Sequence, residues 1–451
     1  MQCRWQRVAT AVGAFALTAG VLAGCGGGAS NTPQQSNAPT GSKTGGETIT
    51  FWADVEAPLN QQKQIWQPVL DQFEQQTGIH VNYQAIGWDS LLNQITTQIT
   101  SGASDVDVVG IGNTWASSLA ATNGLLPLTP DRLQQIGGKE KFVPAAFGLT
   151  GLPGQDPVAV PYISEAMGLF YNKEMFQQAG ISDPPKTWDE FLADAKKLTD
   201  PAKKQYGVVL DTGDTSDMAH LFFVLLSQKG GSFFADQAGK RPTLTTSQAH
   251  EAAKFIGDLF TQKVISPGSA EYNSADEMNN AFINGEGAMM ISQNNSMATL
   301  DNSPMKGKYG VAPVPIFSGG QNVTSHVAGI DLAIFKNSQH QQAALQFLKF
   351  VTDKEAQVEL NKGFHQFPAN KEALNDPAFS QGNLAVFKQV LLTSAKPTPQ
   401  VPTYTQVETD VGSAIKAIAS AAATGQNYGD ALIDQQLKTA NDDIAALSAT
   451  P

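Results

Sequence analysis

The chain has 451 residues, of which 29 are basic and 41 acidic, so its formal net charge is −12. This balance excludes the basic surface that binds nucleic-acid phosphates, and no nucleic-acid partner is expected. Charged residues make up only 16% of the chain, against about 25% in typical soluble proteins. Two explanations stay open: a surface adapted to acidic surroundings, where carboxylate charge is lost, or a compositional bias of the source lineage.

The first segment has the pattern of an export signal. Arg4 and Arg7 precede an apolar run at 8–22, and two small residues stand before Cys25. The run is shorter than the roughly 20 residues that span a membrane, which disfavours a retained transmembrane helix. The pattern resembles a bacterial lipobox, which implies removal of residues 1–24 and acylation of Cys25. The other cysteine lies in the removed segment, so the mature chain would have no disulfide.

Residues 25–46 consist mostly of Gly, Ser, Asn, Thr, Pro and Gln. This composition is too polar to build a core and predicts a flexible tether. The remaining length of about 400 residues is enough for two or three domains.

From residue 47 the pattern alternates between strand and helix. Strands are expected at 48–51, 79–85 and 105–112, and helices at 59–73 and 89–102. Pro68 should kink the first helix or mark its restart, and Asp89 or Ser90 should cap the second. This order predicts an α/β layer with right-handed crossovers. Ligands bind beyond the carboxyl ends of such strands, which directs attention to 52–56 and 112–115.

A second α/β region follows. Strands are expected at 206–211, 286–292 and 329–335, and helices at 247–260 and 343–351. Ser247 is the expected cap of the first of these helices. In the stretch at 182–191, Thr187 and Glu190 have the spacing of a capping box, which starts a helix sharply. Trp188 and Phe191 should pack that helix against the fold.

Four segments, in this order, resemble the sugar-binding family of extracellular solute-binding proteins of ABC transporters, which includes maltose-binding protein. They are YNKEMFQQAGISDPPKTWDEF at 171–191, FINGEGAMMI at 282–291, AGIDLAIFKNSQHQQAALQFLKFVTD at 328–353, and GQNYGDALIDQQLKTANDDI at 425–444. The resemblance covers nearly the whole chain from residue 47 onward.

The resemblance implies a two-lobe α/β fold of the periplasmic-binding-protein type, with a hinge and a ligand cleft between the lobes. The first lobe would hold 47–162 and 329–374, and the second 163–328 and 375–451. The implied function is capture, without catalysis, of a mono- or oligosaccharide that is delivered to an ABC permease. The receptor would be an extracytoplasmic monomer, anchored to the cell membrane through the Cys25 lipid, with no cofactor and no metal.

A sugar site needs aromatic platforms for C–H faces and planar polar groups for hydroxyls. The resemblance implies that Glu165, in the crossing segment with Tyr162, contacts sugar hydroxyls. Relatives often carry a tryptophan where this chain has amides at 293–295, and amides also suit hydroxyls. A packing role stays open for Trp52 and Trp115. The full set of candidates is Trp52, Asp54, Glu56, Asn113, Thr114, Trp115, Tyr162, Glu165, Asp211, Gln293, Asn294, Asp331, His365 and Tyr404.

Three other functions are weighed. A secreted glycoside hydrolase would need a flanking carboxyl pair, and Asp105 and Asp107 stand in a predicted strand instead. Metal capture is disfavoured because the six histidines are scattered without ligand spacing. Glycerol phosphates are disfavoured because Arg132 and Arg241, the arginines after residue 25, lie outside the predicted cleft loops.

Overall fold

The computed structural model describes residues 46–449. The predicted export signal, Cys25 and all but the last residue of the predicted tether therefore lie outside the described residues.

A six-stranded sheet is built from two separate stretches of the chain, with strand order β11, β4, β10, β3, β1, β2. Its strands are β1 (Thr48–Asp54), β2 (His80–Ile86), β3 (Val108–Gly112), β4 (Ala159–Glu165), β10 (Ala328–Ile334) and β11 (Phe367–Pro368). β1 is parallel to β2 and β3, and β10 is antiparallel to β3 and β4. The chain leaves β1 toward β2 and then crosses to β3 on the opposite side, so the strand order reverses between β1 and β3.

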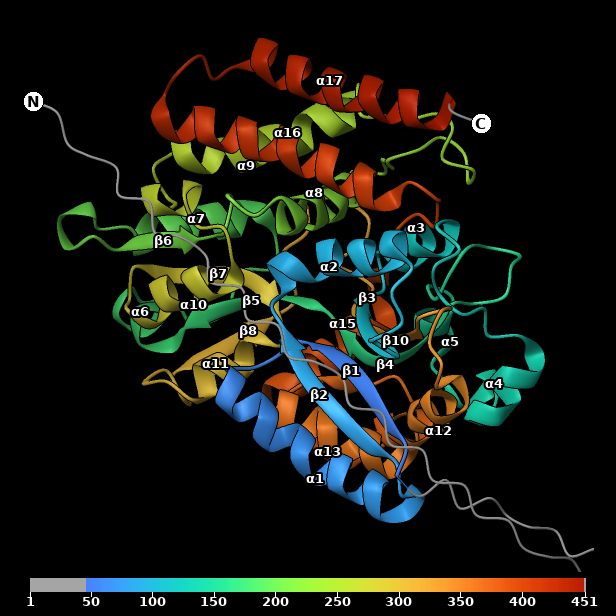
Figure 1. Ribbon diagram of the computed structural model, residues 1–451. Helices are drawn as coiled ribbons and strands as arrows, with labels where there is room; N and C mark the ends of the chain where they lie inside the picture. The colour runs from blue at the N-terminus through green and yellow to red at the C-terminus, as the bar shows by residue number, and fades with distance from the viewer. Residues whose placement is uncertain (1–45, 450–451) are drawn as a thin grey trace, which may run out of the picture. The chain divides into compact units, whose positions relative to one another are not determined.

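Helices cover both faces of this first sheet. Ile49, Phe51 and Ala53 alternate along β1 and are buried against α1 (Leu59–Thr77), α12 (Gln341–Val351) and α13 (Lys354–Phe364). Figure 1 shows α1 and α13 beside β1 and β2. The opposite face packs against α2 (Trp88–Ser101) and α3 (Ala116–Ala121). Short helices complete this half: α4 (Pro130–Ile136), η1 (Lys139–Lys141), α5 (Pro144–Phe147) and α14 (Lys371–Leu374).

A second sheet has four strands in the order β6, β7, β5, β8. They are β5 (Met167–Asn172), β6 (Tyr206–Val209), β7 (Gly287–Gln293) and β8 (Tyr309–Ala312). β6 and β7 are parallel, and β5 is antiparallel to β7 and β8. Two short strands, β9 (Ser325–His326) and β12 (Ala395–Lys396), pair beside it.

The second sheet is also covered on both faces. Leu169 and Val208 face a core, called the second core, that is formed with α7 (Trp188–Leu198), α8 (Thr215–Gln228), α9 (Ser247–Thr261), α16 (Tyr404–Thr424) and α17 (Asp430–Ala449). Their neighbours Phe170 and Val209 face a core with α10 (Ala275–Ile283), α11 (Ser296–Asp301) and α15 (Gly382–Thr393). In Figure 1, α16 runs next to α8, α9 and α17. The remaining elements are α6 (Lys173–Gln178), η2 (Pro201–Lys203), η3 (Pro267–Ala270) and η4 (Pro377–Ser380).

Some sequence expectations hold at the level of single residues. Thr187 and Glu190 form the expected capping box at the start of α7, and Trp188 and Phe191 are buried against the second core. α2 is capped at its end by Gly102, which adopts a left-handed conformation, as expected for a helix stop.

Other element boundaries were wrong. β1 is longer than predicted, so Trp52 and Asp54 lie inside it rather than after it. Of the two alternatives for Pro68, a kink or a restart of α1, the restart is wrong. The helix continues through this proline, which stands on the exposed side, where water can satisfy the freed carbonyl. α2 begins at Trp88 after Gly87, not after a cap at 89 or 90. The cap of α9 is Thr246, not Ser247.

The sequence placed Asp105 and Asp107 in a strand, and this prediction is wrong, because both residues precede β3. Asp107 accepts hydrogen bonds from the Thr50 backbone N–H at 2.8 Å and from the Ser338 hydroxyl at 2.6 Å. Asp105 accepts one from Gln98 at 2.8 Å. Both carboxylates are therefore held in structural contacts.

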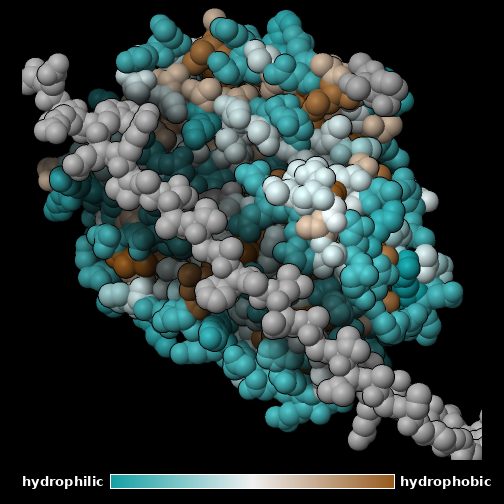
Figure 2. Space-filling view, viewed as in Figure 1, coloured by the Kyte–Doolittle hydropathy of each residue, from teal (hydrophilic) through white to brown (hydrophobic). Residues whose placement is uncertain are grey.

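The face shown in Figure 2 is mainly hydrophilic, and its apolar residues occur in small separate groups. Leu59 and Leu392 are the large apolar side chains that stand exposed in the described part of the chain. Within residues 46–449, no helix combines the length and the apolar character needed to cross a membrane.

Candidate ligand-binding site

The candidate site lies where strand ends of the two sheets meet. β1, β3 and β4 run in the same direction, so their carboxyl ends lie at one edge of the first sheet. The chain passes from the end of β4 through Ala166 directly into β5 of the second sheet. Asn294, which follows β7, exchanges two hydrogen bonds with Ala166 at 2.9 and 3.2 Å. This arrangement brings the ends of β1, β4 and β7 together, as the switch-point rule predicts.

Three buried carboxyl groups stand at the edge of the first sheet. Asp54 ends β1, Glu56 follows it, and Glu165 ends β4; their exposed fractions are 1%, 8% and 4%. The Tyr162 hydroxyl donates to Oδ1 of Asp54 at 3.1 Å. The side-chain amide of Gln366 donates to Glu165 at 2.9 Å and also to Glu56, so it bridges the two carboxyl groups.

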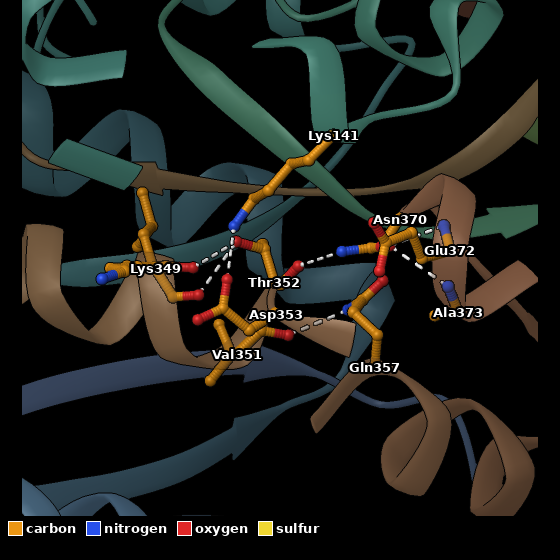
Figure 3. A network of polar contacts seen from close by, with 10 residues as sticks. Lys141, Lys349, Val351, Thr352, Asp353, Gln357, Asn370, Glu372 and Ala373 are labelled. Atoms are coloured by element: carbon orange, nitrogen blue, oxygen red, sulfur yellow. Dashed lines mark hydrogen bonds and ion pairs between the residues drawn. The ribbon is translucent and has the colours of Figure 1, made fainter. Parts of the chain in front are cut away.

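Gln366 is held in place by the helix that precedes it. Gln357 of α13 donates to the Val351 carbonyl at 2.9 Å and accepts from the Ala369 backbone at 3.1 Å. Asn370 donates to the Thr352 carbonyl at 3.0 Å. Figure 3 shows Gln357 and Asn370 on the same side of this network, both pointing toward the end of α12. These bonds fix the segment that follows α13 and so orient the bridging amide.

Burial and mutual repulsion change the acidity of the three carboxyl groups. Burial, together with the charge of Asp54, raises the pKa of Glu165 to about 8. Burial and the charges of Glu165 and Asp54 raise the pKa of Glu56 well above its ordinary value. Burial also raises the pKa of Asp54. Desolvation disfavours the charged form of each carboxyl, and neighbouring like charges add to the effect.

The second sheet contributes further carboxyl groups. Asp211 follows β6 and is 2% exposed. It lines a small cavity with Asp217 of α8 and with Gln293 at the end of β7. Burial and the charge of Asp217 raise the pKa of Asp211 well above its ordinary value. The charge of Asp217 also raises the pKa of Glu165, after the larger effects of burial and Asp54, which links the carboxyl groups of both sheets electrostatically.

A buried histidine pair lies next to Asp217, with Nδ1 of His220 3.9 Å from the Asp217 carboxyl group. His220 of α8 contacts Glu408 of α16 at 2.6 Å, and its ring stacks on His326 of β9 with centroids 4.1 Å apart. Burial opposes protonation of His220, but Glu408 and Asp217 raise its pKa to about 10. Burial and the neighbouring His220 lower the pKa of His326 well below its ordinary value. His220 is therefore the cation of the pair.

Contacts join the two sheets around the site. Asn295, after β7, donates to Glu56 at 3.5 Å, and Asn302 donates to Gln61 of α1 at 2.8 Å. On the side of α3, the Thr405 backbone donates to the Ser118 hydroxyl at 3.0 Å. The two halves of the chain thus meet directly at the edge where the carboxyl groups gather.

The two tryptophan candidates pack against the first sheet. Trp115 is buried and stacks on Trp88 with centroids 4.3 Å apart. Trp52 is half-buried, donates from its indole to Gln84 at 3.1 Å, and meets Phe335 edge to face. Both rings therefore have packing partners, and Trp52 keeps part of its surface exposed.

Several predicted polar residues hold the backbone together. Asn113 donates to the Val327 carbonyl at 3.0 Å. Asn294 donates to the carbonyl of His365, which caps the end of α13. Asp331 lies inside β10, and burial raises its pKa well above the ordinary value. Thr114 is buried after β3, and Tyr404 is buried in the second core at the start of α16.

Sequence reasoning missed two members of the carboxyl network. Gln366 stands next to the candidate His365, in a stretch already considered, but its link to Glu56 and Glu165 spans 310 and 201 residues. Asp217 reads in the sequence as an ordinary acidic residue in the first turn of a helix. Its position near Asp211 follows only from the packing of α8 on the sheet.

The chemistry available at the site is hydrogen bonding. Carboxylate oxygens accept from hydroxyl or ammonium groups, and the amides of Gln293 and Asn295 both donate and accept. In the part of the chain that the structure describes, no group of three or more His, Cys, Asp or Glu side chains is arranged to hold a metal ion.

Known proteins share this architecture. Residues 57–358 match a family described as bacterial extracellular solute-binding protein. A binding protein of Brucella abortus is 28% identical over 344 residues, 76% of this chain and 81% of the relative. The diacetylchitobiose binding protein of Streptomyces coelicolor is 26% identical over 427 residues, 91% and 92% of the two chains.

Solved structures agree with the sequence relatives. Maltose-bound MalE3 of T. maritima has a TM-score of 0.77 at 26% identity, over 89% of this chain and 99% of that one. The predicted two-lobe α/β class is confirmed, and these relatives are binding proteins rather than enzymes.

Proposed function

Because the chain belongs to the bacterial extracellular solute-binding protein family, we propose that it is the receptor of an ABC importer for a mono- or oligosaccharide. The observation that carries this proposal is the meeting of carboxyl and amide side chains at strand ends of both sheets, with the partly exposed Trp52 two residues before Asp54 in β1. Such a set matches the hydroxyls and C–H faces of a sugar. The names of relatives that bind maltose and diacetylchitobiose support the same ligand class.

The capture mechanism is closure of two lobes over the ligand. The lobes comprise 47–162 with 329–374, and 163–328 with 375–451. A ligand that contacts Glu56 and Asp211 at once binds both lobes, and it favours the closed state by its differential affinity for that state. The hydrogen bond between Asn295 and Glu56 joins the same two parts of the chain. The closed receptor then delivers its ligand to the permease.

The receptor is held at the membrane by acylation of Cys25. Its location is extracytoplasmic, as the family implies, and the lipid keeps it beside the transporter. Replacing Cys25 with serine would release the protein into the medium or periplasm. Membrane retention of the Cys25→Ser variant, without lipid, would refute the tether.

A thermal-shift screen tests the ligand. Mono-, di- and oligosaccharides, polyols and glycerol phosphates are added to the purified protein. A ligand at about 100 times its dissociation constant stabilises the folded state by about 2.7 kcal/mol. We expect sugars to raise the unfolding temperature. The Glu56→Gln variant should show a smaller shift, and the control Glu140→Gln, which changes an exposed residue, should show the full shift. Absence of a shift with every sugar would refute the carbohydrate proposal and leave the family standing.

A further inference from the structure

The candidate site gathers an excess of negative charge. Asp54, Glu56 and Glu165 come from the first sheet, and Asp211 and Asp217 come from the second half of the chain. The Gln366 amide joins Glu56 to Glu165. Asp211 and Asp217 line one cavity with Gln293, and Asn295, two residues further on, donates to Glu56. Both sets of carboxyl groups therefore lie close to the end of β7. Four of the five side chains are at least nine-tenths buried, Asp217 being the exception.

The protein supplies little positive charge to balance this cluster. Among residues 46–449, the lysine and arginine ion pairs all involve other carboxylates. The nearby cation is His220, which lies 3.9 Å from Asp217 and is already engaged by Glu408 at 2.6 Å. Buried charges are normally paired, because desolvation of an unpaired ion is costly.

Protonation relieves part of this repulsion, because burial and neighbouring charges raise the pKa values of Asp54, Glu56, Glu165 and Asp211. Asp211 and Asp217 line the same small cavity. In addition, Oδ2 of Asp54 and Oδ2 of Asp211 receive no hydrogen bond from a donor group among the described residues.

We propose that the ligand carries a protonated amine, as an amino sugar does, and that this cation binds among the five carboxyl groups. An ammonium group offers three donors and a full positive charge. It satisfies the free oxygens of Asp54 and Asp211 and offsets the repulsion that the cluster otherwise relieves by protonation. The inference rests on the proposed function, since it specifies which sugars the same site takes.

A matched pair of disaccharides tests the charge. N,N′-diacetylchitobiose is neutral, and its deacetylated form carries two amines on the same backbone. Calorimetric titration of the full-length protein, at a pH where the amines are charged, gives both dissociation constants. We expect the deacetylated form to bind at least tenfold more tightly. We also expect its binding enthalpy to vary between buffers of different ionisation heat, because carboxyl protons are released.

Variants assign the preference to the cluster. Glu165→Gln keeps the size of the side chain and an oxygen that can accept from Gln366, but removes an ionisable group. Glu165→Gln should reduce the preference for the deacetylated over the acetylated disaccharide, and it should also reduce the number of protons released on binding. The control Glu140→Gln removes an exposed carboxylate on η1 and should change neither. A ratio unaffected by Glu165→Gln would overturn the proposed position of the amine.

The outcomes separate the inference from the proposed function. Tighter binding of the neutral form overturns the inference and leaves the carbohydrate receptor intact. The same holds if neither disaccharide binds but a neutral sugar shifts the unfolding temperature. Failure of every sugar, charged or neutral, overturns both. If a simple diamine without a sugar ring binds as tightly as the deacetylated disaccharide, the proposed ammonium site is retained and the carbohydrate ligand class is overturned.

Discussion

Substitution of Glu165 by glutamine should stabilise the folded protein, compared with the natural chain. This stabilisation should be larger at neutral pH than at acidic pH. The pKa of Glu165 is raised from its ordinary value of 4.5 to about 8, chiefly by burial. An acid whose pKa is raised by folding binds its proton more tightly in the folded state. Folding therefore becomes less favourable as the pH rises from 4.5 toward 8.

The size of this effect follows from the same values. At pH 7, about 2.5 units above the ordinary pKa, the folded state is penalised by about 3 kcal/mol, at 1.36 kcal/mol per unit. At pH 4.5 the penalty is a few tenths of a kcal/mol. Glutamine does not ionise and keeps an acceptor for Gln366. The difference in free energy of unfolding between Glu165→Gln and the natural chain should thus shift by about 3 kcal/mol in favour of the variant from pH 4.5 to pH 7.

Urea unfolding at both pH values measures the difference. Tryptophan fluorescence and far-ultraviolet circular dichroism should give coincident transitions if unfolding is two-state. Glu140→Gln, an exposed carboxylate in η1, is the matched control and should show no gain between the two pH values. A free-energy difference for Glu165→Gln that is the same at pH 4.5 and pH 7 would refute the reasoning from burial and repulsion.

Three further substitutions test other parts of the structure. A Cβ at Gly110 would collide with the Asp54 carboxylate, so Gly110→Ala should lose about 1 to 3 kcal/mol and weaken sugar binding, measured by thermal unfolding with and without ligand. Unchanged ligand shifts would contradict this. Thr187→Ala removes the cap of α7 and should cost about 1 kcal/mol in urea unfolding, with no change in ligand affinity. His220 has a pKa raised to about 10 from 6.5, so its stabilising effect is complete below pH 6.5 and is lost as the pH rises toward 10. The cost of His220→Gln should accordingly be larger at pH 6 than at pH 9, and an equal cost at both would argue against a buried cation.

Local patterns predicted the individual elements and the class of fold. Alternation at Ile49 and Phe51 predicted β1, and the spacing of Thr187 and Glu190 predicted the start of α7. These signals are carried by residues a few positions apart, where side-chain periodicity and capping act. The predicted boundaries of elements were less accurate, because packing decides where an element ends. For example, β1 continues through Trp52 to Asp54, since it pairs with β2 along its whole length.

The tertiary structure alone decided which polar residues act together. The sequence presents Asp54, Glu165 and Gln366 as separate residues in a loop, a crossing segment and a stretch beside a histidine. Their convergence depends on sheet order, which places β1 and β4 at the same edge across two intervening strands. Acidity also depends on this convergence, because desolvation and repulsion arise only when the carboxyl groups are buried together. The sequence by itself therefore determined the elements, the fold class and the family resemblance, and folding determined the charge of the site.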